Sequence, residues 1–424
     1  MDIAQLARLD VLQQDPYEAY ARARRSPGLT FVEELNAWLV SRQADVREVL
    51  RRPDDFSSAN ALTPDIPPSP AVLAELSRGL GGRPTVVTSD GAAHQRLRAP
   101  LSRGLSPARV AAAVPFIRER AAALVASFAS PASTASPAST ASTSVAGAGE
   151  PPVDLVGRYA RRLPGEVIGH LIGLAPDDVP LAINGSYRAE QLLFRPLPAD
   201  EQVRAAREVV ELQHLLDEHA RGRRANPRDD VCSEMVSAFA PGDGDLSLDQ
   251  RREIVSNLQN LLIAGHLTTT ALIGTAVLHL LRDRPQWEML CAHPELIPAA
   301  VEEAARFDTA LQGSRRVTTR PVTLAGHDLP AGAVVFVAFG SANRDEAAVE
   351  RPDVFDITRT PVRHLAFGHG VHGCPGAQLA REQLRITLET LTGRLPGLRL
   401  APGQDDSMLP TMIHRSPRTL LVIP

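Results

Sequence analysis

The residues best suited to chemistry lie in one stretch, HLAFGHGVHGCPGAQLAR, which spans residues 364 to 381. It contains a single cysteine, Cys374, in a glycine-rich loop just before a predicted helix from about 376 to 393. Glycines keep such a loop thin against a planar cofactor, and amides near the helix start can point at the sulfur and tune it. A lone cysteine in this setting is well placed to bind a redox metal as thiolate, and the chemistry fits haem iron.

A dinucleotide-binding loop is one alternative reading of the same stretch. Gly368, Gly370 and Gly373 satisfy the G-x-G-x-x-G pattern ahead of a helix. That site needs a continuing βαβ unit and an acidic residue about 20 positions later. Only one helix and a short tail follow here, and Glu389 lies within that helix, which argues against a dinucleotide.

Zinc is the second alternative, because His369, His372 and Cys374 could supply three ligands. A structural zinc site is completed by four ligands, usually cysteines and histidines at short spacings. No fourth cysteine or histidine lies at the spacing of a zinc finger. Zinc therefore fits the stretch less well than haem does.

A long helix is predicted from 247 to 282, yet its centre reads LLIAGHLTTT, residues 261 to 270. Glycine and threonine weaken a helix. The ends are clear, because Ser247 and Gln250 form a capping box and Pro285 follows the last turn. The weak centre is explained either by a close approach of the backbone to a flat ligand or by a packing kink.

Composition excludes several classes of function. The chain has 424 residues, a formal charge of −4 and 45 basic residues that are all arginine. Without lysine there is no Walker phosphate loop, pyridoxal Schiff base or kinase-type ATP site, and without a basic stripe there is no case for nucleic acid. The N-terminus shows neither a signal peptide nor a membrane anchor, and three widely spaced cysteines suit a reducing compartment, so we expect a cytoplasmic protein away from the membrane.

The predicted elements are mainly helices. Helical periodicity covers 153–175, 201–222, 247–282 and 376–393, whereas PVTLAG, AVVFVAF and TLLVIP read as strands, clustered in the C-terminal half. The segment 130–152 repeats SPAST and offers almost nothing to a core, which predicts a flexible surface insert.

The stretch FGHGVHGCPG matches F-G-x-G-x-H-x-C-x-G, and the chain therefore resembles the cytochrome P450 family over nearly its whole length, apart from 130–152. The resemblance implies one domain, 1–424, that is mainly α with small β-sheets and has a long central helix over the haem. It also implies haem b as cofactor, with Cys374 as the iron ligand. The matching cofactor-binding positions are Phe367, Gly368 and Gly376 in the cysteine loop, and His94, Arg98, Arg316 and His372 as partners of the propionates.

Two further family patterns are present. Glu303 and Arg306 match E-x-x-R and, with Arg359, resemble the ion network that supports the cysteine loop. Ala264, Gly265 and Thr268 match the catalytic segment of the central helix, where Thr268 would hold dioxygen and help to deliver protons.

Leu267 departs from the family pattern, because it stands where an Asp or Glu usually relays protons. His266 could substitute, although it points about 100° away around the helix. A substrate group or a water chain could supply the proton instead. The third explanation for the missing acid is that the protein catalyses atypical chemistry, such as a peroxide-dependent oxidation or a rearrangement.

The resemblance implies a monomeric monooxygenase of the bacterial soluble type, which receives electrons from NAD(P)H through a ferredoxin reductase and a ferredoxin. Hydroxylation or epoxidation of a hydrophobic secondary metabolite, such as a polyketide or peptide that is free or tethered to a carrier protein, is the expected reaction. A haem-binding sensor or carrier without turnover is an alternative from another class, and Thr268 argues against it. The pocket residues expected from the family placements are Leu192, Leu193, Leu261, Leu262, Leu311, Met408, Thr411 and Met412.

Overall fold

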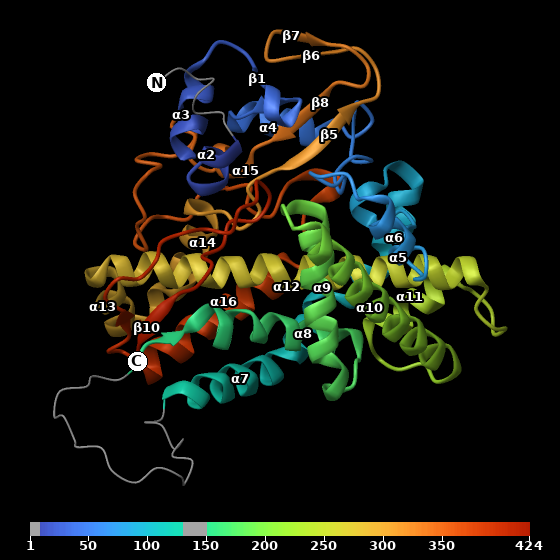
Figure 1. Cartoon of the computed structure of the whole chain (residues 1–424). Coiled ribbons are helices and arrows are strands. Elements are labelled where there is room, and N and C mark those ends of the chain that lie inside the picture. The colour runs from blue at the N-terminus through green and yellow to red at the C-terminus, as the bar shows by residue number, and fades with distance from the viewer. Residues whose placement is uncertain (1–8, 130–150) are drawn as a thin grey trace.

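The fold is built mainly from helices arranged around one long central helix (Figure 1). A computed structural model describes residues 9–129 and 151–424 of the chain, so the predicted insert 130–152 lies outside the described residues except for its last two positions. The helices are α2 Leu9–Gln14, α3 Tyr17–Arg25, α4 Gln43–Arg51, α5 Pro70–Leu76, α6 Gly91–Gly104, α7 Pro107–Ala129, α8 Arg162–Ile172, α9 Val179–Phe194, α10 Ala199–Ala225, α11 Val231–Phe239, α12 Leu248–Arg282, α13 Arg284–Ala292, α14 Ile297–Phe307, α15 Phe339–Ala342 and α16 Ala377–Arg394.

Three small sheets complete the fold. The largest has the order β1-β2-β8-β5-β3, in which β2 and β8 are parallel and the other pairs are antiparallel. The second sheet has the order β4-β10-β9, and β6 and β7 form a hairpin. The strands are β1 Thr30–Val32, β2 Ala37–Val40, β3 Phe56–Ser57, β4 Val153–Asp154, β5 Ser314–Thr318, β6 Val322–Leu324, β7 His327–Leu329, β8 Val334–Val337, β9 Arg399–Leu400 and β10 Leu421–Ile423.

The strand prediction was right for β6, β8 and β10, but the expected clustering in the C-terminal half was wrong. Strands β1, β2 and β3 come from the first 57 residues and join the largest sheet. They contain only two to four residues each, too few to show a period-2 pattern, and their pairing with β5 and β8 is set by tertiary contacts. The predicted helix 153–175 also begins later, because β4 and a π turn at Val156–Ala160 precede α8.

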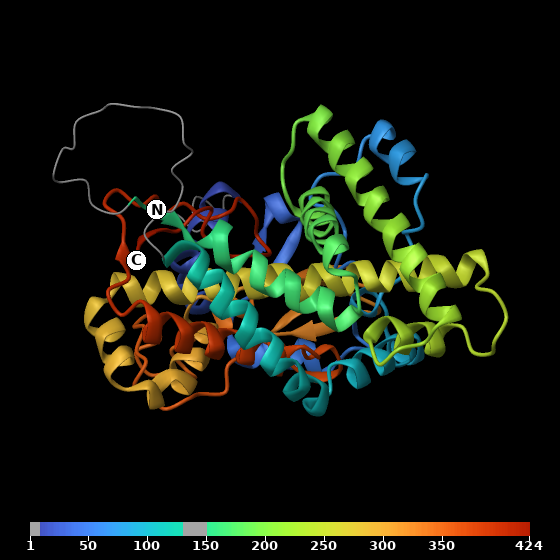
Figure 2. The same cartoon turned by 90° about the horizontal axis from the view of Figure 1, so that it is seen from below.

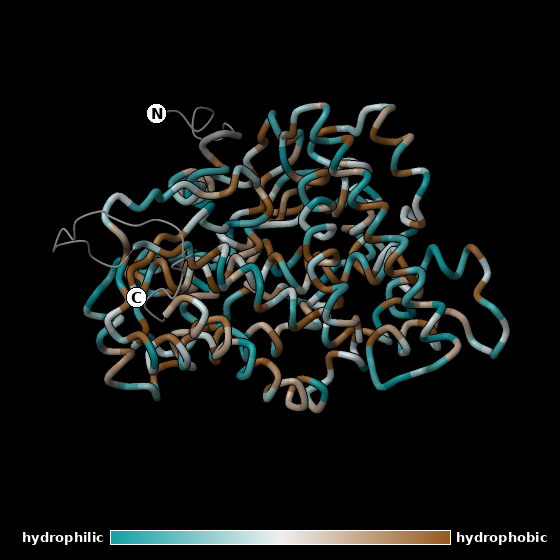
Figure 3. Tube along the Cα trace, turned by 60° about the horizontal axis from the view of Figure 1, so that its bottom comes forward, coloured by the Kyte–Doolittle hydropathy of each residue, from teal (hydrophilic) through white to brown (hydrophobic). Residues whose placement is uncertain are grey.

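Helix α12 crosses the whole molecule, with the largest sheet on one side and α7, α8 and α16 on the other (Figures 1 and 2). It begins with the predicted capping box, since the Ser247 hydroxyl accepts from the Gln250 amide and the Gln250 side chain accepts from the Ser247 amide. The helix is long and apolar enough to span a membrane, yet 83% of its most apolar window is buried inside the protein. It is therefore a core helix, and many of its residues belong to the largest buried hydrophobic cluster. Figure 3 shows hydrophobic stretches spread through the whole trace.

A buried ion network fixes the end of α14 to distant parts of the chain. Asp308 accepts hydrogen bonds from the Tyr17 hydroxyl at 2.6 Å and from Arg415, and it lies 2.9 Å from His279 Nε2. Burial alone would raise the pKa of Asp308, but Arg415 and His279 outweigh it and hold that pKa well below its usual range. One carboxylate thus joins α3, α12 and the C-terminal loop.

We expect Asp308→Asn to lower the free energy of unfolding by about 3–5 kcal/mol, because it leaves Arg415 buried without a counter-ion. The control Asp249→Asn removes an exposed partner of Arg83 and should cost at most about 1 kcal/mol. Because the pKa of Asp308 is depressed, its contribution is present above the unfolded value of about 3.9 and is lost as the pH falls. Denaturant unfolding at pH 7 and pH 3.5 measures both effects, and equal losses in the two variants would contradict the prediction.

Candidate active site

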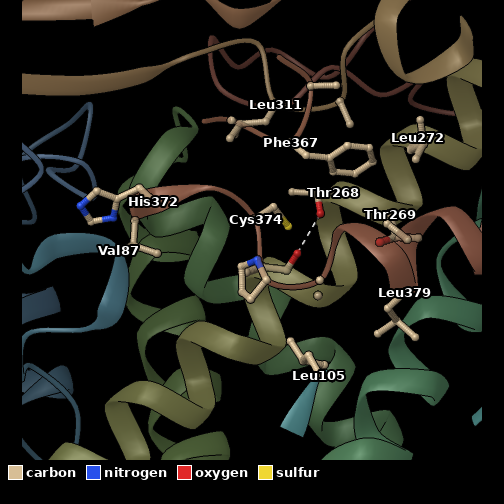
Figure 4. A pocket seen from close by; sticks show the side chains of 18 of the residues that line it. Val87, Leu105, Thr268, Thr269, Leu272, Leu311, Phe367, His372, Cys374 and Leu379 are labelled. Atoms are coloured by element: carbon tan, nitrogen blue, oxygen red, sulfur yellow. Dashed lines mark hydrogen bonds between the residues drawn. The ribbon is translucent and has the colours of Figure 1, made fainter. Parts of the chain in front are cut away.

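The site is a cavity of about 260 Å³ between α12 and the loop that carries Cys374. Thr268 on α12 and Cys374 both face this space (Figure 4). Other walls come from α6, α8, α15, α16, the pair Val86 and Val87, and the segment from Ala305 to Arg316. Most of the lining side chains are apolar. The region around Arg98, Arg316 and His372 is called the polar end of the cavity.

Backbone geometry fixes the cysteine loop. The Cys374 amide donates to the Phe367 carbonyl at 2.8 Å, so the two ends of the loop are joined directly. Gly370 has φ +69°, and a Cβ there would lie 2.5 Å from the Leu50 carbonyl oxygen, so only glycine fits. Gly368 also has positive φ, and Gly376 follows the cysteine at the start of α16. The loop is therefore pre-shaped to hold its sulfur toward the cavity.

The Cys374 sulfur experiences opposing influences. Burial raises the pKa of Cys374, whereas the Gly376 amide and the charges of Arg98 and Arg381 act in the opposite direction, and the net shift is upward. The side chain is still accessible from the cavity that it lines. A metal would bind it as thiolate, because coordination removes the proton.

At the polar end of the cavity, nitrogen donors outnumber carboxylates. Arg316 is only 6% exposed and donates to the Ser314 hydroxyl and the Arg315 carbonyl, with no carboxylate paired to it among the described residues. Burial lowers the pKa of Arg316 to about 10. Nearby, the Nε2 atoms of His94 and His372 are buried and make no hydrogen bond, and the two rings lie 4.3 Å apart. Three potential donors therefore converge where anionic oxygens of a ligand would satisfy them.

Arg98 and Asp90 border this polar end. Arg98 lines the cavity and donates to the Gly373 carbonyl at 2.6 Å, so it also secures the cysteine loop. Asp90 lies 3.6 Å from His372 Nε2 and accepts from Ser57 and Ser58. The sequence prediction missed Asp90, although its place directly before α6 is a signal for a helix cap.

On the opposite wall, α12 stays helical through its weak centre. The Thr268 hydroxyl donates to the Ala264 carbonyl at 2.8 Å, and both residues face the cavity. Gly265 has a further reason to be glycine, because a Cβ there would lie 2.9 Å from the Ile168 side chain on α8. A close helix contact therefore accounts for this glycine without a kink.

Neither of the residues beside Thr268 on its N-terminal side offers an acid to the cavity. Leu267 is 5% exposed and does not line it. His266 points away, with Nε2 at 2.8 Å from the Arg161 carbonyl and Nδ1 at 3.1 Å from the Ser186 hydroxyl. Burial lowers the pKa of His266 to about 4, so this histidine is neutral near pH 7.

The predicted ion network forms around α14. Glu303 and Arg306 are buried and joined by two hydrogen bonds of 2.8 Å, and Arg359 donates to Glu303 at 3.2 Å. Arg306 also donates to the carbonyls of Asn343 and Pro352. The pair thus supports the irregular chain that leads to the cysteine loop.

The predicted pocket residues divide into two groups. Leu261 and Leu311 line the cavity. The others do not line it. Leu262, Met408, Thr411 and Met412 are buried elsewhere, and Leu192 and Leu193 are partly buried. The neighbouring positions Leu261 and Leu262 show the difficulty, because the resemblance does not tell which side of a segment faces inward.

The zinc and dinucleotide readings find no support in the structure. Among residues 9–129 and 151–424, no group of three His, Cys, Asp or Glu side chains could hold a metal ion. The strands after α16, β9 and β10, are antiparallel to each other and form no βαβ unit with it. A single cysteine ligand remains as the way this site would hold a metal.

Comparison with known proteins decides the family. The cytochrome P450 family model matches residues 189–395. Cytochrome P450 107B1 of Saccharopolyspora erythraea is 33% identical over 410 residues, which cover 95% of this chain and 93% of that protein. The chain belongs to the cytochrome P450 family.

Other cytochrome P450s are similar to this chain in sequence and in structure. Mycinamicin IV hydroxylase/epoxidase of Micromonospora griseorubida is 35% identical over 394 residues, covering 91% of this chain and 89% of that enzyme. The structure of cytochrome P450 CREJ in complex with (4-ethylphenyl) dihydrogen phosphate superimposes with a TM-score of 0.85 at 28% identity, covering 96% and 97% of the two chains. This chain is therefore a P450 monooxygenase with the P450 fold.

The residues of the cavity fit the haem that the family binds. Cys374 would be the iron ligand. Two propionates would engage a group of buried nitrogen donors, in which the Nε2 atoms of His94 and His372 make no hydrogen bond and Arg316 has no paired carboxylate among the described residues. Arg98 borders the same end. Haem would thus satisfy polar groups that are otherwise costly to bury.

We expect Arg316→Leu to accelerate haem loss by about tenfold or more, because it removes a charge-assisted hydrogen bond to a propionate. The same change should stabilise the haem-free protein, since it removes a buried cation without a carboxylate partner. Haem transfer to an excess of apomyoglobin and urea unfolding of haem-free protein measure the two effects. The control Arg315→Leu, which loses the pair with Asp65 and a hydrogen bond to the Thr63 carbonyl, should retain haem as the wild type does. Equal haem loss in both variants would refute the assignment.

Proposed function

We propose that this P450 inserts one oxygen atom from dioxygen into an apolar secondary-metabolite substrate by hydroxylation or epoxidation. The observation that carries the proposal is the single cavity in which Thr268 on α12 faces the Cys374 loop. Bound haem would supply the oxidising chemistry. A sensor or carrier without turnover has no use for a hydroxyl at Thr268.

The lining of the cavity supports an apolar substrate. The walls include apolar side chains such as Val87, Leu272 and Leu311 (Figure 4). Burying apolar surface gives affinity, whereas the few polar groups would orient the bound molecule. A polyketide or peptide scaffold fits this requirement, and the name of the mycinamicin relative, a hydroxylase/epoxidase, points to the same reaction types.

Thr268 would organise protons at the reacting oxygen. Its hydroxyl donates to the Ala264 carbonyl, which leaves both oxygen lone pairs free to accept from a water in the cavity. A hydroxyl held in this way fixes the position of that water without carrying a charge. It would thus anchor the water that relays protons, and it would not itself be the proton source.

The proton source would be water or the substrate itself. Among the described residues that line the cavity, none is Asp or Glu. His266 is neutral near pH 7 and engaged with Arg161 and Ser186, so it is not available. A hydroxyl or carboxyl on the substrate, or a water chain, would complete the path, and atypical peroxide chemistry is the alternative that Leu267 leaves open.

Electrons would come from NAD(P)H through a reductase and a ferredoxin in the cytoplasm. Matched structures include an intact type IV self-sufficient P450 monooxygenase, of which this chain covers 51%. The part of this chain that aligns corresponds to about half of that protein. A monomer is the state we propose.

We expect Thr268→Ala to lower the ratio of oxidised product to NAD(P)H consumed by at least about threefold, because the relay water loses its anchor. Thr269→Val is the matched control, since Thr269 also lines the cavity and the change keeps its shape. The measurement is product yield against cofactor oxidation with a reconstituted ferredoxin system and an apolar substrate that shifts the haem spectrum. Equal coupling in the wild type and Thr268→Ala would remove Thr268 from the mechanism.

We expect Leu267→Asp to speed the reaction of the reduced protein with dioxygen by at least about threefold in a proton-dependent manner, because it adds the acid that the helix lacks. Leu267→Asn, which has the same shape and no charge, should behave like the wild type. Stopped-flow mixing of the dithionite-reduced protein with dioxygen measures the rate of this reaction and requires no known substrate. An unchanged reaction rate in Leu267→Asp would show that position 267 delivers no protons. The lack of any spectral response to dioxygen would favour the peroxide alternative.

A further inference from the structure

A second ionic group lies beside the one that supports the cysteine loop. Arg381 on α16 donates from Nε and Nη2 to the two carboxylate oxygens of Glu302, at 2.6 and 2.9 Å. His364 Nε2 lies 3.0 Å from the same carboxylate. The pKa of Glu302 is lowered to about 2 because these two partners outweigh the effect of its burial, so Glu302 is charged at any pH at which the protein works.

The group reaches the cysteine through an aromatic ring. The guanidinium carbon of Arg381 lies 4.3 Å from the centre of the Phe367 ring, a cation–π distance. The carbonyl of Phe367 accepts the Cys374 amide at 2.8 Å. The His364 ring, 5.9 Å from the Phe367 ring, packs on the same aromatic side chain. A continuous set of contacts therefore leads from Glu302 to Cys374.

This group is distinct from the network of Glu303, Arg306 and Arg359. Glu303 bonds Arg306 and Arg359, whereas the adjacent Glu302 bonds Arg381 and His364. The first set secures the backbone between α15 and the cysteine loop. The second holds the cation of Arg381, whose charge, like that of Arg98, acts on the Cys374 sulfur.

We propose that Arg381, held on Phe367 by Glu302 and His364, is a positioning residue that limits electron donation from the Cys374 thiolate and so sets the reduction potential of the haem iron. The inference rests on the proposed haem-thiolate function. A cation near the sulfur stabilises negative charge there, so less of it reaches the iron. The ferrous state, which carries one electron more, is thereby favoured over the ferric state.

The charge distribution gives the two members of the ion pair opposite effects. Removal of the cation in Arg381→Gln should shift the midpoint potential to a more negative value. Removal of the anion in Glu302→Gln leaves the cation uncompensated and should shift the potential to a more positive value. A loss of packing alone would not give opposite signs.

The experiment is spectroelectrochemical titration of the haem-loaded full chain in low salt, because Arg381 is partly exposed and added salt would screen its charge. At the wild-type midpoint, the ratio of ferrous to ferric protein should fall about threefold or more in Arg381→Gln and rise in Glu302→Gln. Arg385→Gln is the matched control, since Arg385 lies one turn further along α16 in a comparable pair with Glu382 and Glu389. It should leave the ratio unchanged.

Shifts of the same sign in Arg381→Gln and Glu302→Gln, no shift in either, or an equal shift in Arg385→Gln would each overturn the proposal. Arg381→Lys covers the case in which the glutamine variants lose haem, because it keeps the charge and should retain a potential close to that of the wild type. The absence of a thiolate-type absorption band in the ferrous–CO wild type would instead overturn the proposed function, so the two failures are distinguishable.

Discussion

The bidentate pair between Glu303 and Arg306 is the interaction on which the rest of the site depends. It is buried on α14, and its remaining hydrogen-bonding capacity is used on the backbone of the irregular segment from Asn343 to Asp356 and on Arg359. This segment has few regular backbone hydrogen bonds of its own, so its carbonyls need side-chain donors. A buried ion pair is expensive, and here it is balanced by several charge-assisted bonds that hold the chain leading to Cys374 in one shape.

Two buried charge clusters differ in how fully their charged groups are paired. Around Asp308, cations and a carboxylate match, and the cluster joins three distant parts of the chain. Around Arg316, donors outnumber acceptors, and burial depresses the pKa values of Arg316 and His372. The first cluster stabilises the protein alone, whereas the second is complete only with an anionic ligand. Binding of haem would therefore stabilise the folded state, because the ligand satisfies groups that the chain leaves unpaired.

Local patterns in the sequence were sufficient where the physical cause is local. The capping box of α12, the E-x-x-R pair and the glycine-rich turn before α16 each depend on residues close together in the chain. Tertiary causes remained hidden. The glycine at 265 is required by Ile168 on α8, Arg381 is placed by Glu302 on α14, and Met408 and Met412 turn into the core. The spacing of residues in the sequence does not reveal such contacts. The neighbouring helix or strand decides which side of a segment faces inward.

The distal wall places a constraint on how this P450 handles protons. The Thr268 hydroxyl already donates to the Ala264 carbonyl, so donating to a ligand would forfeit a hydrogen bond worth about 0.5–1.5 kcal/mol. Accepting from a water costs nothing of this kind. With an aliphatic side chain at Leu267 and a neutral, engaged His266, the helix contributes no charge to compete for that water. The wall therefore favours proton delivery that depends on what enters the cavity, which would couple oxygen chemistry to the presence of a correctly placed substrate.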